Sequence, residues 1–148
     1  MKIFRTLRGV ISGTESDEPD YFAYGATLRI FGDALDFDQI SRTLGVNATR
    51  SHRKGDRKRD GALGFGHDMW AYQPSVPEDR PLAEHIESLW SQIRPAEAYL
   101  RDLKRVATVD VFLGYRSNID HAGFEVPHTA LEMFVRLEIP LGVSIIIA

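Results

Sequence analysis

The residues best suited to chemistry gather in one basic stretch, residues 49–60, which reads TRSHRKGDRKRD. Six of its twelve residues are Lys or Arg, and two are Asp. Guanidinium and ammonium groups both bind phosphate oxygens, and a glycine lets backbone N–H groups approach an anion. We therefore name Arg50, Arg53, Lys54 and Gly55 as candidate anion-binding residues.

The same stretch has a simpler interpretation as a solvated loop. Asp56 and Asp60 offer partners within it, and it contains no aromatic side chain that could stack on a nucleobase. Six cations and two anions give it a charge of +4, which leaves −7 on the other residues, because the whole chain carries −3. A nucleic-acid-binding protein is more often basic overall, so the composition indicates a local positive field on an acidic body.

Two histidine groupings have residue types found in catalytic or metal sites. His67 and Asp68 could form an acid–base pair, but no adjacent residue supplies an activated nucleophile. His121, Glu125 and His128 form a second set, and their side chains are of the types that serve as zinc ligands in proteins. It spans an expected hairpin and the approach to a helix, so it lacks the one-face arrangement of a helical zinc site. We name no catalytic residue, no metal ligand and no cofactor.

The composition limits the class of protein further. The chain contains no cysteine, which excludes disulfides, thiolate catalysis and cysteine-based zinc sites. No apolar run reaches the roughly 18 residues that a membrane span needs. Arg5 and Arg8 interrupt the apolar start, which is therefore not a convincing signal peptide. We expect a cytoplasmic protein with no membrane segment.

The pattern from residue 21 onward predicts the elements that position these groups. Residues 21–32 alternate apolar and polar side chains, which is typical of a strand. Asp36 is a predicted N-cap, and Gly45 ends the short helix that follows. In this prediction residues 49–60 are an exposed loop that leads to a second strand at residues 67–73.

Two helices are predicted next. An apolar stripe over residues 82–93 predicts the longest helix, whose Leu89 and Trp90 are expected in the core. Pro95 breaks this helix and starts another, because proline is tolerated in a first turn. The apolar face of the second helix extends to Leu103.

The last third of the chain predicts more strands. Residues 107–116 alternate clearly, and a short strand near residues 124–126 could pair with them. Thr129 and Glu132 form a capping box for a helix that ends near Glu138. Residues 143–148 are apolar on both faces, so we expect this strand to lie centrally in the sheet or to be covered by a partner subunit.

The predicted order is strand, helix, strand, two helices, two strands, helix, strand. Each helix has one apolar face, as expected for packing on a sheet. We therefore expect an α+β fold, with a mixed or antiparallel sheet of about four to five strands and helices mainly on one face. A length of 148 residues favours one domain. We assign residues 1–20 to an N-terminal extension and linker, and residues 21–148 to a single α+β domain.

The chain also resembles a bacterial family catalogued only as a domain of unknown function. The segments that carry the resemblance are LRIFGDALD, FDQISRTLGV and TRSHRKGD, then the strand with Trp70 and the closing helix–LG–strand, in this order. The resemblance covers most of residues 21–148. The family pattern often ends in a strand with an acidic or aromatic finish, whereas this chain ends in SIIIA. The family brings no established reaction, so the resemblance implies no catalytic residues.

Together these observations favour a non-enzymatic binding or interaction module. We expect residues 49–60 to bind an anionic ligand or an acidic protein. Nucleic-acid or nucleotide binding through the same loop is the alternative, and it predicts steep salt dependence. A hydrolase-type enzyme is the third hypothesis, and it requires a pocket with convergent polar groups. A homo-oligomer is left open.

Overall fold

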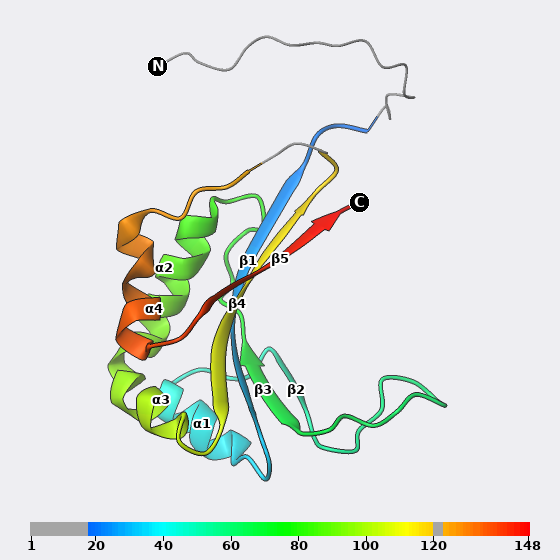
Figure 1. Cartoon of the computed structure of the whole chain (residues 1–148), viewed down its shortest axis with the longest axis vertical. Helices are drawn as coiled ribbons and strands as arrows, with labels where there is room; N and C mark the ends of the chain where they lie inside the picture. The colour runs from blue at the N-terminus through cyan, green and yellow to red at the C-terminus, as the bar shows by residue number, and fades with distance from the viewer. Residues whose placement is uncertain (1–17, 120–122) are drawn as a thin grey trace.

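One mixed sheet of five strands organises the chain (Figure 1). The computed structural model describes residues 18–119 and 123–148. The strand order is β2-β3-β1-β4-β5, in which β4 and β5 are parallel and the other neighbours are antiparallel. The strands are β1 (Phe22–Gly32), β2 (Arg50–His52), β3 (Asp68–Tyr72), β4 (Thr108–Ser117) and β5 (Leu141–Ile147). The predicted α+β fold with a mixed sheet is confirmed.

The helices lie together on one face of this sheet (Figure 1). Two of them are preceded by short 3₁₀ turns, which connect them closely to the preceding chain. The helical elements are α1 (Phe37–Leu44), α2 (Leu82–Ile93), η1 (Arg94–Ala96), α3 (Glu97–Leu103), η2 (His128–Leu131) and α4 (Glu132–Leu137).

The core fills the space between these helices and the sheet. Alternate residues of β1 and β4 point toward the helices and are buried, as the sequence pattern predicts. The α2 stripe packs over them, with Leu89 fully buried and Trp90 7% exposed, so both predicted core positions are confirmed. The Nε1–H of Trp90 donates to Glu132 of α4 at 3.2 Å, which satisfies the one polar atom of this ring.

The other face of the sheet carries an ion pair instead of a helix. The guanidinium of Arg29 on β1 donates two hydrogen bonds, of 2.8 and 2.7 Å, to the carboxylate of Asp110 on β4. It also lies over the rings of Phe31 and Phe112, at 5.1 and 4.4 Å from their centroids. A planar cation therefore covers two aromatic rings that water would otherwise reach.

The local helix signals near the first helix are confirmed. The Oδ1 of Asp36 accepts the backbone N–H of Gln39 at 2.9 Å, which caps α1. Gly45 follows α1 with φ of 69°, the left-handed conformation that glycine adopts without a steric penalty. Pro95 lies in the 3₁₀ turn that leads into α3, as its tolerance of a first turn predicts.

Two predicted strand assignments were wrong. Residues 50–52, expected in an exposed loop, form the edge strand β2 against β3. This short edge strand carries polar side chains, so it has no apolar alternation to reveal it. Residues 124–126, expected to pair with the strand at 107–116, are irregular. Phe124 and Val126 were expected in that strand, but instead they pack against the core from outside the sheet.

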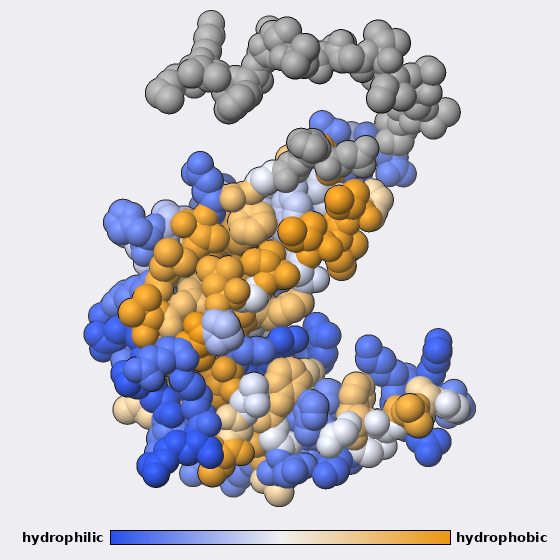
Figure 2. Space-filling model, viewed as in Figure 1, coloured by the Kyte–Doolittle hydropathy of each residue, from blue (hydrophilic) through white to orange (hydrophobic). Residues whose placement is uncertain are grey.

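The last helix and strand also differ from the prediction. The helix does not use the Thr129–Glu132 capping box; a 3₁₀ turn starts at His128 and α4 follows with no side-chain cap. β5 begins at Leu141, and it lies at the edge of the sheet instead of at its centre. Figure 2 shows apolar side chains along this strand. Its exposed residues are Leu141, Ile145, Ile146 and Ile147.

Candidate functional site

The basic stretch lies mostly in a loop that projects from the sheet between β2 and β3 (Figure 1). We call residues 53–66 the arm. Its base continues from β2 and returns to the start of β3, so both ends are held by paired strands. Most of its side chains are exposed.

The base of the arm is organised by the buried carboxylate of Asp68. Its Oδ1 accepts the backbone N–H of Lys54 at 2.8 Å, and its Oδ2 accepts the backbone N–H of Leu35 at 3.0 Å. Oδ2 also accepts Nη1 of Arg53 at 2.9 Å. The hydrogen bond from Lys54, followed by those from Arg53 and Leu35, holds the pKa of the Asp68 carboxyl below its usual value. This carboxylate therefore ties the arm to the loop after β1.

Arg53 and Lys54 are both bound within the chain. The Nη1 of Arg53 donates to the carbonyl of Leu35 at 2.7 Å, and its guanidinium lies 3.6 Å from the centroid of the Phe37 ring. The Nζ of Lys54 donates to Asp33 at 3.1 Å. Arg53 and Lys54 are two of the four predicted anion-binding residues. Their charged groups are engaged in contacts that hold the arm in place.

Backbone contacts then stiffen the lower half of the arm. Gly55 has φ of 89°, and its N–H donates to the carbonyl of Phe65 at 2.8 Å. The N–H of Phe65 donates in turn to the carbonyl of Asp56 at 2.9 Å. The Phe65 ring stacks on His52 with 3.6 Å between centroids. The N–H groups of Lys54 and Gly55 are thus occupied, and the predicted anion nest at Gly55 gains no support from them.

The tip of the arm is different, because its cations are exposed. Arg57, Lys58 and Arg59 make no ion pair or side-chain hydrogen bond within residues 18–119 and 123–148. Leu63 follows them and is 96% exposed, the most exposed large apolar side chain of the described protein. An exposed leucine beside three unpaired cations is a surface suited to contact with another molecule.

Arg50 stands apart from the other predicted residues. It lies on β2 at the edge of the sheet, is exposed, and pairs through its backbone with Ala71. The fold therefore brings Arg53, Lys54 and Gly55 together at the base, and leaves Arg50 on the strand beside it. Whether any of these four residues binds an anion stays a prediction. The sequence analysis missed Asp68 as the anchor and Leu63 as an exposed apolar side chain.

A family model described as a domain of unknown function, DUF4279, matches residues 22–147, from the first residue of β1 to the last of β5. The chain belongs to this family. No curated protein and no solved structure matched the sequence. Membership in DUF4279 confirms the predicted resemblance to a domain family of unknown function, and it assigns no reaction.

Two further side-chain groupings were predicted in this DUF4279 domain. The carboxylate of Asp68 is bound at the base of the arm, whereas the ring of His67 meets Phe31 edge-on at 5.1 Å. The two residues therefore have separate contacts. In the set with Glu125 and His128, His121 lies outside the described residues. Among the residues that are described, no three His, Asp or Glu side chains are grouped to hold a metal ion.

A helix that crosses a bilayer must be both long and apolar. No helix in the described part of the chain meets both conditions.

Proposed function

We propose that the protein is a non-enzymatic binding module that holds an acidic protein partner through the tip of its arm. The observation that carries the proposal is the exposed set Arg57, Lys58, Arg59 and Leu63. The three cations complement carboxylates on the partner, and they attract it over a distance of several ångströms. The leucine supplies the apolar anchor that a protein interface buries at its centre.

The chemistry of the tip favours a protein over a nucleic acid. Proteins that bind single strands offer aromatic rings on which bases stack. The aromatic residue of the arm, Phe65, is already stacked on His52 at the base. An exposed leucine contributes nothing to phosphate binding, but it fits an apolar pocket of a protein.

The stiff base supports the same proposal. Binding through a loop costs conformational entropy when the loop is ordered by its partner. Here Asp68, Gly55 and Phe65 hold the lower half of the arm by hydrogen bonds before any partner arrives. The entropy cost of ordering the lower half is therefore already met on folding, and the tip extends from a fixed base.

The proposal extends to the setting of the protein. We propose a bacterial, cytoplasmic module, which the lack of cysteine supports because a reducing compartment gives disulfides no role. We also propose that a homo-oligomer covers β5. Among the described strands, β5 pairs with β4 alone, and it exposes Ile145, Ile146 and Ile147. An apolar edge strand of this kind is a template for pairing with another chain.

Three fluorescent probes test the arm by anisotropy at low and at physiological salt. The probes are an Asp- and Glu-rich peptide with one leucine, polyglutamate, and a short DNA duplex. We expect the leucine-containing peptide to bind most tightly and replacement of Arg57, Lys58 and Arg59 by Ala to abolish its binding. Leu63→Ser is expected to lower the affinity for the peptide to the affinity for polyglutamate.

The matched control replaces three exposed cations of the helical side, Arg42, Arg94 and Arg105, by Ala. This variant loses the same charge and is expected to bind the peptide at nearly wild-type affinity. Equal loss in the two triple variants would contradict a site on the arm, as would no peptide binding at low salt. Tightest binding of the duplex, with steep salt dependence, would instead favour the nucleic-acid alternative.

A further inference from the structure

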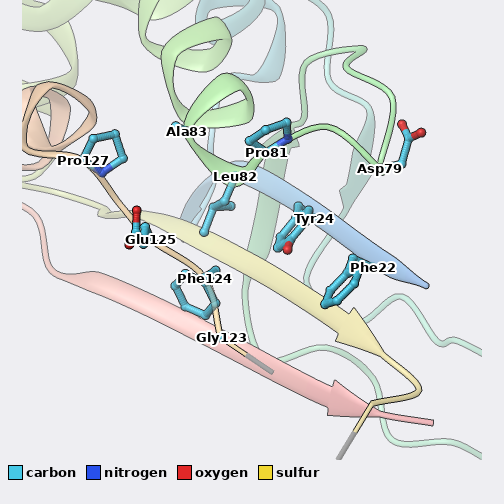
Figure 3. Close-up of a pocket in the computed structure, with 10 residues that line it drawn as sticks. All are labelled: Phe22, Tyr24, Asp79, Pro81, Leu82, Ala83, Gly123, Phe124, Glu125 and Pro127. Atoms are coloured by element: carbon cyan, nitrogen blue, oxygen red, sulfur yellow. The ribbon is translucent and has the colours of Figure 1, made fainter. Parts of the chain in front are cut away.

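A pocket at the opposite end of β1 from the arm has a separate chemistry (Figure 3). It has a volume of about 810 Å³, within the range of small-molecule sites. Phe22 and Tyr24 line it from the start of β1, whereas the arm anchor Asp68 pairs with Gly32 at the end of that strand. The start of α2 and the segment 123–127 complete the walls.

Aromatic rings dominate this pocket. Figure 3 shows Phe22 and Tyr24 from β1 and Phe124 from the segment that crosses the sheet. The Tyr115 ring of β4 contacts all three, with centroids at 6.4 Å from Phe22, 5.5 Å from Tyr24 and 5.6 Å from Phe124. Leu82 closes the side toward α2. The four rings thus form a continuous aromatic cluster at the pocket.

Tyr115 has a polar atom that the fold does not satisfy. The residue is only 4% exposed. Its hydroxyl is buried and has no hydrogen-bond partner among the described residues. A buried hydroxyl without a partner costs free energy, and buried tyrosines normally find one. Tyr115 is not among the residues that line the pocket, so its ring supports the lining rings from behind and its buried hydroxyl is not offered to a ligand.

The charges of the pocket have one sign. Asp79 and Glu125 are its charged lining residues, and both are exposed at its rim. The lining residues include no Lys, Arg or His. Two carboxylates beside aromatic faces repel an anionic ligand and attract a cation.

We propose that this pocket binds a small organic cation, an ammonium group carried on an apolar or aromatic body. The ammonium lies against the faces of Tyr24 and Phe124 by cation–π attraction, in the negative field of the rim carboxylates Asp79 and Glu125. The apolar body fills the space beside Phe22 and Leu82. This site goes beyond the proposed arm function and shares no residue with it.

Calorimetric titration of the full chain tests the charge preference with three probes of similar size. They are 2-phenylethylammonium, the neutral 2-phenylethanol and the anion 3-phenylpropanoate. We expect the cation to bind about ten-fold more tightly than the alcohol, in line with the attraction of a partly desolvated cation to aromatic rings and carboxylates. The anion is expected to bind most weakly. Equal affinity for all three, or no binding of the cation, would overturn the proposal.

Three variants locate the binding. Tyr24→Leu keeps an apolar side chain and removes a ring on which the ammonium lies, and it is expected to weaken binding of the cation about five-fold while leaving the alcohol-to-anion order unchanged. The double variant Asp79→Asn with Glu125→Gln is expected to bring the cation and the alcohol within about two-fold of each other. Phe124→Ala is expected to weaken the binding of all three probes, because it removes an aromatic wall of the pocket.

Glu87→Gln is the matched control, since Glu87 is an exposed carboxylate of α2 outside the pocket. It should bind all probes as the wild type does. If Glu87→Gln weakens binding of the cation as much as the double variant of Asp79 and Glu125 does, general surface charge explains the preference. That result would overturn the proposed site. The arm variants should leave this titration unchanged, so the two proposals fail separately.

Discussion

The Nη1 of Arg53 lies 2.9 Å from Oδ2 of Asp68 and 2.7 Å from the carbonyl oxygen of Leu35. An arginine within the most basic stretch of the chain is therefore engaged with its own protein. Within the arm, the cations left for a partner are those of the tip, four to six residues further along the chain.

Arg53 and Arg57 should differ sharply in their effect on stability. Arg53→Ala removes a donor from a buried carboxylate and a cation from the Phe37 ring, and it is expected to lower Tm by several degrees. Arg57→Ala is expected to leave Tm unchanged, because that side chain is exposed and makes no ion pair within the described residues. Thermal melts followed by circular dichroism measure both. Equal Tm values for the two variants would contradict the anchoring role of Arg53.

The carboxylate of Asp68 should make the protein sensitive to acid. Its folded pKa is lowered, so its contribution is present above the ordinary aspartate pKa of about 3.9 and is lost as pH falls through the lower folded value. We expect Asp68→Asn to be less stable than wild type at pH 6, with the gap narrowing toward pH 3. Urea unfolding at several pH values measures this gap, and Asp60→Asn, an exposed position, is the control. A gap that is constant with pH would contradict the prediction.

His85 should produce a second pH dependence, nearer neutrality. It is fully buried in α2, its Nδ1 has no partner among the described residues, and burial lowers its pKa. The unfolded chain therefore binds a proton more readily, so stability is complete above pH about 6.5 and declines as pH falls below it. His85→Leu is expected to remove this decline between pH 7.5 and 5.5 in urea unfolding. Persistence of the full decline in the variant would assign it to another group.

The core prediction concerns the stripe of α2. Trp90→Ala is expected to lower the free energy of unfolding by about 3–5 kcal/mol, because a large buried ring is replaced by a cavity. Val135→Ala is the control, since Val135 is 73% exposed, and it should change stability by about 0.5 kcal/mol or less. Urea midpoints measure both. An unchanged midpoint for Trp90→Ala would exclude this ring from the core.

Removal of the last strand is expected to abolish soluble expression. A chain that ends at Gly142 loses most of β5 and leaves the long strand β4 as an unpaired edge. Ile146→Lys keeps the strand and adds a charge at an exposed position, so it should stay soluble. The soluble fraction after expression compares the two. A truncated protein that is soluble and melts like the wild type would show that β5 contributes little to the fold.

The sequence alone determined the elements whose residues repeat at the period of their own geometry. β1 and β4 alternate because one face of each meets the helices, and α2 has a stripe because one side of it meets the sheet. The cap at Asp36 and the stop at Gly45 were predictable because both depend on residues within one turn. These signals are local, so no knowledge of the rest of the chain is needed to detect them.

Only the tertiary structure decided which residues meet across the chain. β2 has no periodicity of its own and becomes a strand because β3 offers it an edge. β5 is apolar on both faces, yet its place at the edge follows from strand order, which no local pattern encodes. The role of Arg53 changed for the same reason: Asp68 is 15 residues away and Leu35 is 18, and chain folding alone brings their oxygens within reach of its guanidinium.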